Sequence, residues 1–273
     1  MLVKRTLVVA VLLPIGLAAI ILGDLWYFAA IALILGLAAP EFSRLFETGG
    51  YQPAGFLMIA GTLLLVTSRY FLGFDGSDWA LSLIILGAMA YHLVAFERGR
   101  PQAGVDFSIT VAGVVYLGWI GSYLISLRHL PGGMWWVLTV LPSVWLADTG
   151  AYLVGKAIGK HKMSPRLSPG KTWEGFLGGI IFATLGTPLL VWGYLSLGAT
   201  ALGLTPLHGL WLGLVLSLLT PLGDLGESMI KRQVGAKDSG TLLPGHGGMF
   251  DRIDSWLWAG VIGYYLIIWI FQT

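Results

Sequence analysis

Long apolar runs follow one another along almost the whole 273-residue chain, and they constrain its fold more than any other feature. A run of about 20 apolar residues can cross the hydrocarbon of a bilayer as a helix that satisfies its own backbone hydrogen bonds. Such runs occur at approximately residues 6–22, 25–39, 54–70, 79–96, 107–127, 134–155, 173–197, 204–225 and 253–271. We therefore predict an all-α polytopic membrane protein with about nine transmembrane helices.

The composition supports lipid as the outer solvent. Charged residues make up 11% of the chain and hydrophobic residues 56%, whereas water-soluble domains contain about 25% charged residues. So few charges cannot cover a water-soluble protein of this size. The chain also has no cysteine, which excludes disulfides, thiolate metal sites and cysteine nucleophiles.

The distribution of basic residues orients the predicted helices, because Lys and Arg are enriched on the cytoplasmic side of membranes. With nine helices and a cytoplasmic N-terminus, only Arg69 and Arg128 fall outside. The other fourteen basic residues fall inside: Lys4, Arg5, Arg44, Arg98, Arg100, Lys156, Lys160, Lys162, Arg166, Lys171, Lys231, Arg232, Lys237 and Arg252. The first run resembles a secretory signal, but its length, Pro14 and the closely following second run favour a retained helix.

The polar residues divide the chain into two functional parts. Residues 1–130 have short connections and few polar residues within the runs, so we expect scaffold, lipid and subunit contacts there. Residues 131–273 contain two longer polar loops, at 156–172 and 231–252, both predicted to be cytoplasmic. We expect the catalytic site in this second part, at the cytoplasmic face.

The densest group of polar residues lies at residues 223–232. Asp224, Glu227, Ser228 and Lys231 are spaced i, i+3, i+4 and i+7, which places them on one face of a helix. Ionisable groups at membrane depth usually face a protein interior or a water-filled cavity. A purely structural alternative is that these side chains extend from the helix end to the membrane interface and that Asp224 pairs with Lys231. This alternative explains Lys231 and Arg232 well but explains Asp224 poorly.

A second group follows at residues 237–254. Its many glycines and prolines suit a tight loop whose backbone N–H groups approach an anion. Asp251 and Asp254 then open the last helix at i and i+3, which ordinary helix capping also explains. Capping does not explain a third acid, Asp224, at the same membrane face. Carboxylates with few other ligands favour magnesium over zinc, since His246 has no second histidine or cysteine at ligand spacing.

The third group lies at residues 164–175. Gly170-Lys171-Thr172 imitates the end of a P-loop, but Pro165 replaces the first required glycine and no strand is expected before it. Two Ser-Pro turns that bring Lys171 to a helix capped by Thr172 are a simpler interpretation, and they suit phosphate binding. A basic loop that binds anionic lipid headgroups remains an alternative for Lys160 and Lys162. Asp148, about two turns from the end of its helix, is a further candidate metal ligand.

Residues 228–254 resemble the signature of the phosphatidate cytidylyltransferases, also called CDP-diacylglycerol synthases. The resemblance rests on Ser228, Lys231-Arg232, Lys237-Asp238, Gly240, Leu243-Pro244, His246-Gly247-Gly248 and Asp251-Arg252-Ile253-Asp254. Residues 164–175, Asp148 and the many-helix layout are also similar to the family. The resemblance thus covers essentially the whole chain and is closest in the polar motifs.

The resemblance implies that the phosphate of phosphatidic acid attacks the α-phosphate of CTP and releases pyrophosphate. It implies Mg²⁺, with a second cation that is monovalent, such as K⁺, and a homodimer in the inner (plasma) membrane with no nucleic-acid partner. The implied catalytic residues are Asp224, Asp251, Lys231 and Arg232, and the implied metal ligands are Asp148, Asp224, Asp251 and Asp254. The implied substrate-binding residues are Ser168, Lys171, Ser228, Lys237, Asp238, His246, Gly247, Gly248 and Arg252.

Two other interpretations remain open from the sequence. One is a lipid nucleotidyl or phosphoryl transfer enzyme with another acceptor, such as an isoprenoid alcohol or an archaeal lipid. The other is a transporter whose intramembrane acids bind a cation. Transporters often show broken helices in both halves, whereas the polar residues of this chain gather in one half.

Overall fold

The computed structural model describes residues 2–199, 203–242 and 247–271, and the side chains of residues 10–199, 203–242 and 247–270. Its contacts divide the chain into two compact units. The first unit is Met1–Ser126 with Ile230–Ile253, and the second is Leu127–Met229 with Asp254–Thr273. The described residues are helical apart from short connections and one small β-hairpin, which confirms the predicted all-α class.

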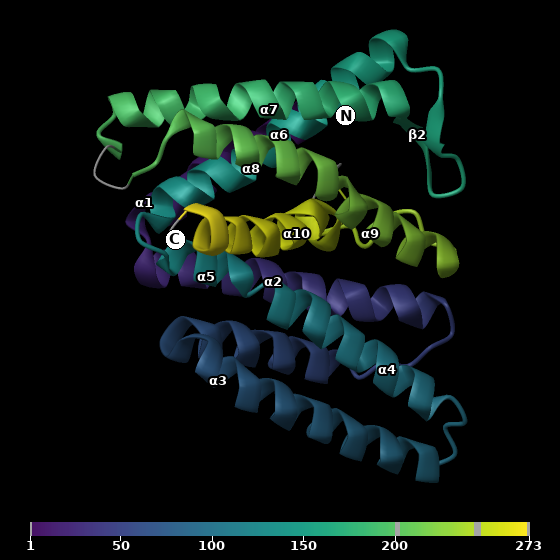
Figure 1. The fold of residues 1–273 in the computed structure, drawn as a ribbon. Helices are drawn as coiled ribbons and strands as arrows, with labels where there is room; N and C mark the ends of the chain where they lie inside the picture. Colours follow the sequence, from purple (N-terminus) through teal and green to yellow (C-terminus); the bar gives the residue numbers. More distant parts are fainter. Residues whose placement is uncertain (1, 200–202, 243–246, 272–273) are drawn as a thin grey trace. The chain divides into compact units, whose positions relative to one another are not determined.

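The first unit contains the N-terminal helices, coloured from purple through blue to teal in Figure 1. These are α1 (Leu2–Leu22), α2 (Asp24–Thr48), α3 (Gly55–Glu97), α4 (Ala103–Gly113), the π-helical η1 (Val114–Ile120) and the start of α5 (Tyr123–His129). Helix α2 continues through Pro40 to Thr48, nine residues beyond the predicted end at residue 39. The added turns carry Glu41, which lies in the interior of the unit.

Helix α3 is 43 residues long and is interrupted at Gly73, whose φ of 68° no ordinary helical residue adopts. Figure 1 shows the two arms of α3 turning back on one another at this point. The arms correspond to the predicted runs at residues 54–70 and 79–96. A Cβ atom at Gly61, in the first arm, would lie 3.1 Å from Ile84 in the second, so the arms pack closely.

A buried arginine fixes the turn of α3. Arg69 is 1% exposed, and its guanidinium donates to Ser77 Oγ at 2.8 Å and to Ser126 Oγ at 3.0 Å. The guanidinium also lies 3.7 Å from the centre of the Phe74 ring, at cation–π distance. Arg69, one of the two basic residues predicted on the outer side of the membrane, thus stabilises the turn of α3.

The second unit contains α6 (Gly133–Ile158), the strands β1 (Lys162–Ser164) and β2 (Ser168–Thr172), α7 (Trp173–Ser196) and α8 (Pro206–Leu219). Helices α6, α7 and α8 pack against one another. A Cβ atom at Gly179 would lie 2.7 Å from the carbonyl oxygen of Ala147, so a small residue permits the close approach of α7 to α6. The antiparallel β1–β2 hairpin was not predicted from the sequence.

Two further helices pass from one unit into the other. Helix α9 (Pro221–Gln233) begins in the second unit, and α10 (Phe250–Leu266), continued by the π-helical η3 (Ile267–Phe271), begins in the first. The predicted run at residues 204–225 is divided between α8 and α9, because Pro221 cannot donate the hydrogen bond that would continue α8.

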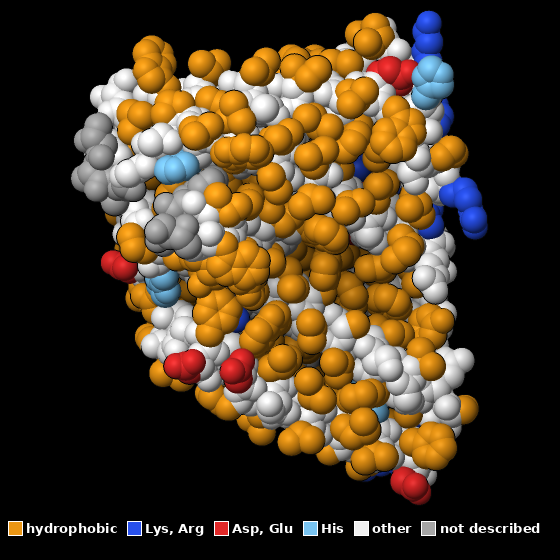
Figure 2. All heavy atoms as spheres, viewed as in Figure 1, with side chains coloured by type: hydrophobic (Ala, Val, Ile, Leu, Met, Phe, Trp, Pro, Cys, Tyr) orange, Lys and Arg blue, Asp and Glu red, His pale blue; other side chains and the backbone are white. Residues whose placement is uncertain are grey.

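Seven helices in the described part of the chain are long and apolar enough to cross a membrane. Three of them combine consecutive elements: α4, η1 and α5; α8 and α9; and α10 and η3. Figure 2 shows hydrophobic side chains over most of one face, and residues such as Leu86, Leu189 and Trp192 are more than 60% exposed. Such a surface is suited to lipid, so the chain is a multi-pass membrane protein.

Candidate active site

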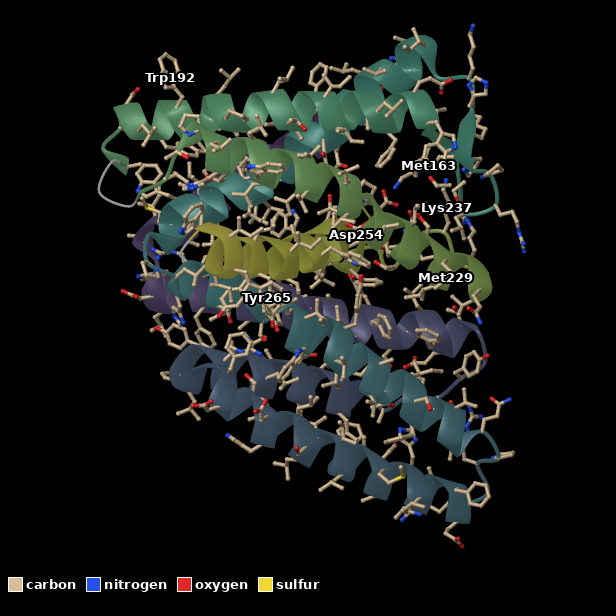
Figure 3. The ribbon with its side chains drawn as sticks, in the orientation of Figure 1. Met163, Trp192, Met229, Lys237, Asp254 and Tyr265 are labelled. Atoms are coloured by element: carbon tan, nitrogen blue, oxygen red, sulfur yellow. The ribbon has the colours of Figure 1, made fainter. Side chains whose placement is uncertain are left out.

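Three carboxylates gather in the second unit. Asp224 and Glu227, on α9, and Asp254, on α10, each offer an oxygen atom, and these atoms lie within 4.8 Å of one another. Glu227 is 3% and Asp254 9% exposed, whereas Asp224 is partly open to solvent. Figure 3 labels Asp254 near the start of α10. We call Asp224, Glu227 and Asp254 the carboxylate cluster.

Local sequence explains how the two helices meet. Asp224 and Glu227 are one turn apart on α9, so their side chains project from the same face. Gly223 precedes them, and a Cβ atom there would lie 2.6 Å from the carbonyl oxygen of Asp254 and 2.8 Å from the ring of Trp258. The absence of a side chain at Gly223 therefore allows α10 to bring Asp254 to the cluster.

A lysine from the β-hairpin reaches the cluster. Lys171 Nζ lies 2.7 Å from Asp224 Oδ2. The hairpin is fixed to the start of α7, because Thr172 Oγ1 accepts from the N–H of Gly175 and Glu174 accepts from the N–H of Lys160 and of His161. The predicted cap by Thr172 is confirmed. This anchoring holds Lys171 beside an acid.

Two more predicted site residues lie around the cluster. Ser228 Oγ donates to Asp224 Oδ1 at 3.3 Å. Asp148 is an exposed residue of α6, and its charge acts on Asp254 together with the charges of Asp224 and Lys171. The structure thus brings Lys171, Asp224, Ser228 and Asp254 into one region of the second unit, with Asp148 within electrostatic range.

The donor set suits a hard divalent cation. Three carboxylates held this close repel one another, and one lysine neutralises only part of their charge. Oxygen ligands without imidazole or thiolate favour magnesium or calcium over zinc. A bound cation would therefore relieve a repulsion that the fold itself creates, and the residues fit the predicted metal.

Asp251 is the centre of a different network, in the first unit. Its Oδ1 accepts from Lys231 Nζ at 2.7 Å, and its Oδ2 accepts from the N–H and Oγ of Ser239 at 3.0 and 2.9 Å and from the N–H of Gly248 at 2.7 Å. Its side chain is 5% exposed. Two of its partners, Lys231 and Gly248, are predicted site residues. The prediction that Asp251 also holds a metal stays a prediction.

The remaining predicted site residues are mostly at the surface. Arg232, Lys237, Asp238 and Arg252 are exposed, and Arg232 donates to the carbonyl oxygen of Ala236. Ser168 lies in β2, opposite Ser164 across the hairpin. Gly247 has a positive φ of 82°. His246 lies outside the described residues.

Three residues of these networks received no role from the sequence. The spacing puts Glu227 on the same helical face as Asp224 without indicating that it is a ligand, and no sequence pattern indicates Ser239. Glu41 lies in the N-terminal part and contacts Ser239 and Phe250. The signal for Glu41 was present, since an acid within an apolar helix is costly and calls for a partner.

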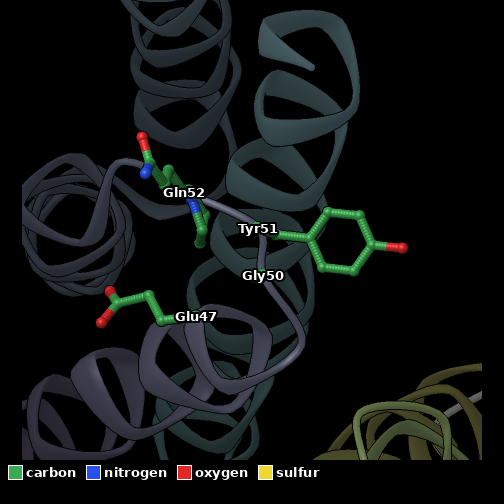
Figure 4. Close-up of a pocket in the computed structure, with 5 residues that line it drawn as sticks. Glu47, Gly50, Tyr51 and Gln52 are labelled. Atoms are coloured by element: carbon green, nitrogen blue, oxygen red, sulfur yellow. The ribbon is translucent and has the colours of Figure 1, made fainter. Parts of the chain in front are cut away.

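A hollow in the first unit lies away from these networks. It has a volume of about 380 Å³ and is lined by Glu47, Gly50, Tyr51, Gln52 and Pro53, as Figure 4 shows. Its backbone is held by Asp106, which accepts from the N–H of Gln52. None of the lining residues is a predicted site residue.

Comparisons with known proteins identify the family of this chain. The sequence profile of the Cytidylyltransferase family matches residues 3–271. A phosphatidate cytidylyltransferase of Pseudomonas aeruginosa is 37% identical, with 98% of this chain and 97% of the relative covered. The proteins of that name from Synechocystis and Staphylococcus saprophyticus are 32% and 33% identical, with 97% and 93% of this chain and 96% and 94% of theirs covered. The chain belongs to the Cytidylyltransferase family.

Proposed function

We propose that this chain is a CTP:phosphatidate cytidylyltransferase, which transfers CMP from CTP to phosphatidic acid and yields CDP-diacylglycerol and pyrophosphate. The observation that carries the proposal is the carboxylate cluster beside Lys171, in a chain whose relatives of that name match it over nearly full length. Acids and a lysine in a multi-pass membrane protein suit a reaction between a water-soluble triphosphate and a membrane lipid.

The reaction forms one bond and breaks one. A phosphate oxygen of phosphatidic acid attacks the α-phosphorus of CTP, and the bond from that phosphorus to the oxygen of the β-phosphate breaks. Pyrophosphate leaves with the electron pair of the broken bond. No protein nucleophile is needed, because phosphoryl-type transfer depends on positioning and on neutralising charge.

We assign metal binding to the carboxylate cluster, with Asp148 as an outer contributor, and expect Mg²⁺ with a second, monovalent cation such as K⁺. Magnesium held by these carboxylates would supply positive charge that neutralises the negative charge developing on the phosphates. Glu227 and Asp254 have little exposure to water, so few water molecules would compete with an ion for these two carboxylates. Glu227 is thus added to the metal ligands expected from the sequence.

Basic side chains complete the charge balance. Lys171 sits between an acid and the solvent, so it can exchange its contact with Asp224 for a phosphate oxygen. We propose that Arg232 and Arg252 also neutralise phosphate charge, and that Lys231 adds positive charge to the site while it stays paired with Asp251. We assign nucleotide binding to the segment from Ser239 to Gly248, because its glycines would let an anion approach the backbone closely, together with Ser168, Ser228, Lys237, Asp238, His246 and Gly247.

The test follows label from the α-phosphate of CTP into chloroform-soluble lipid. Purified protein in detergent micelles is expected to transfer the label to phosphatidic acid when magnesium is present. Transfer should stop when magnesium is chelated and return when it is restored. The proposed lipid substrate would be rejected if the label stayed in the water phase with phosphatidic acid and entered the lipid phase with an isoprenoid alcohol as acceptor.

We also propose nine transmembrane spans with a cytoplasmic N-terminus. A helix of 43 residues would be about 65 Å long, roughly twice the hydrocarbon thickness, so the break at Gly73 suits two spans in α3. Helix α1 would supply the remaining span. The catalytic networks would then face the cytoplasm of a cell bounded by the inner (plasma) membrane.

The chain has no native cysteine, so single introduced cysteines report topology without background. A membrane-impermeant thiol reagent applied to intact cells should label Asp78→Cys, near the turn of α3, and leave Thr48→Cys unlabelled until the cells are opened. Equal labelling of both would contradict this topology.

For the proposed homodimer, light scattering of the purified protein should give twice the 29.4 kDa chain mass after detergent is subtracted.

A further inference from the structure

Glu41 is a buried carboxylate in a part of the chain that the sequence assigns to scaffold. It follows Pro40 on α2 and is 5% exposed. A carboxylate removed from water is costly unless hydrogen-bond donors satisfy it. The donors that surround Glu41 therefore indicate what the fold gains from it.

Those donors come from the segment that precedes α10. Glu41 Oε2 accepts from the backbone N–H of Phe250 at 2.9 Å and lies 3.4 Å from Ser239 Oγ. Ser239 and Phe250 lie at the two ends of the segment that carries Gly247 and Gly248. One side chain from α2 therefore contacts both ends of a segment about 200 residues later in the chain.

Glycines on that segment fit against the same carboxylate. A Cβ atom at Gly240 would lie 2.8 Å from Glu41 Oε1, and a Cβ atom at Gly248 would collide with Glu41 Oε2 and Ser239 Oγ. The backbone at Gly240 and Gly248 thus approaches Glu41 more closely than any other residue type would allow. This contact is specific in shape as well as in hydrogen bonding.

Glu41 and Asp251 divide the donors of the segment between them. Asp251 takes the N–H groups of Ser239 and Gly248, and Glu41 takes the N–H of Phe250. The single hydroxyl proton of Ser239 goes to Asp251, whose oxygen is nearer at 2.9 Å. Asp251 ties the segment to its own helix, whereas Glu41 ties it to α2.

We propose that Glu41 is a positioning residue, which holds Ser239, Gly240, Gly248 and Phe250 in the arrangement that nucleotide binding requires. The proposal rests on the proposed function, because that function assigns nucleotide binding to this segment. Glu41 itself touches no substrate. It acts through the Phe250 N–H and through the packing of Gly240 and Gly248.

Three variants separate positioning from general stability. Glu41→Ala removes both oxygens and leaves the Phe250 N–H without its acceptor, so kcat/KM for CTP should fall about 10- to 100-fold, the cost of misplacing binding groups by about 1 Å. Glu41→Gln keeps an oxygen for the Phe250 N–H and should retain most of the activity. Glu47→Ala is the matched control, an acid on the same helix that is exposed and accepts from Ser43 Oγ.

Hydrogen exchange supplies a readout that does not depend on activity. Peptides that cover residues 239–250 should exchange faster in Glu41→Ala than in the wild type, while peptides from α6 and α7 should be unchanged. Glu41→Gln and Glu47→Ala should match the wild type. Steady-state kinetics on the same samples should place the loss in Glu41→Ala mainly in KM for CTP.

Two results would overturn the proposal. One is a Glu41→Ala protein with unchanged kinetics and unchanged exchange at residues 239–250. The other is equal loss in the Ala and Gln variants with faster exchange throughout the chain, which would make Glu41 a general stability residue. If the wild type transfers no label from CTP, the proposed function fails, and the exchange data still decide whether Glu41 holds the segment.

Discussion

Two lysine–aspartate pairs in this protein have the same length and different surroundings. Lys231–Asp251 in the first unit and Lys171–Asp224 in the second both have an N–O distance of 2.7 Å. The side chains of the first pair are 12% and 5% exposed, and those of the second 25% and 40%. Asp251 has three further hydrogen bonds, whereas Asp224 belongs to a cluster with two other acids.

This difference shows that the N–O distance of an ion pair does not by itself indicate whether the pair is structural or functional. Attraction between opposite charges grows as water is excluded, so breaking the buried pair leaves a charge without its counter-ion and with little water around it. The more exposed pair is screened by water, and each partner can leave it at small cost. We therefore interpret Lys231–Asp251 as a fixed structural pair and Lys171–Asp224 as an exchangeable one.

The largest effect on turnover is expected from removing an acid of the carboxylate cluster, to which Asp224 of the exchangeable pair belongs. Asp254→Asn should lower turnover about 10³-fold, since loss of bound magnesium removes several kcal/mol of charge stabilisation. Without magnesium the variant should be at least as stable as the wild type, because one repulsive charge is gone. Magnesium should raise the thermal midpoint of the wild type and leave that of the variant nearly unchanged.

Asp75→Asn, an exposed acid of α3, is the control for Asp254→Asn and should behave as the wild type in both assays. Near-normal turnover of Asp254→Asn would remove Asp254 from the metal site. An equal magnesium response in both variants would show that the ion binds elsewhere.

The next effect tests the fixed pair. Lys231→Met leaves the Asp251 carboxylate buried without its cation and should lower the free energy of unfolding by about 3 kcal/mol. The double variant Lys231→Met/Asp251→Asn should recover part of this loss, since the buried charge is then absent. Unfolding by SDS in mixed micelles measures the free energy of unfolding of the single and the double variant. A single variant as stable as the wild type would contradict the fixed pair.

The sequence predicted features that depend on local patterns. The apolar runs predicted the helices, the i, i+3 spacing put Asp224 and Glu227 on one face, and Thr172 caps α7 as expected. These depend on residues within one or two turns of each other. The strands β1 and β2 are three and five residues long, too short for an alternating pattern to reveal them.

The sequence could not predict contacts that depend on how distant segments pack. Glu227 and Asp254 meet because α10 crosses α9 at Gly223, and no spacing along the chain encodes that crossing. The partner of Glu41 lies about 200 residues away. In the same way, Lys171 and Asp224 pair across two separate elements. Tertiary packing alone decides such partners.

A smaller effect should follow from crowding the helix crossing. In Gly223→Ala, the new Cβ atom would collide with Asp254 at 2.6 Å, so α10 must shift and stability should fall by about 2 kcal/mol. Turnover should fall as the carboxylate cluster widens. Gly226→Ala is the matched control on the same helix, because its Cβ atom would meet no described atom within 4 Å. Equal effects of the two substitutions would contradict a close crossing at Gly223.

The smallest effect on stability is expected for the exchangeable pair. Lys171→Met should change the free energy of unfolding by at most about 1 kcal/mol, as for other partly exposed ion pairs. Turnover should nevertheless fall, because the lysine that leaves Asp224 for a phosphate oxygen is lost. The contrast with Lys231→Met, at the same N–O distance, isolates burial as the cause. A Lys171→Met protein as destabilised as Lys231→Met would make both pairs structural, and unchanged turnover would remove Lys171 from substrate binding.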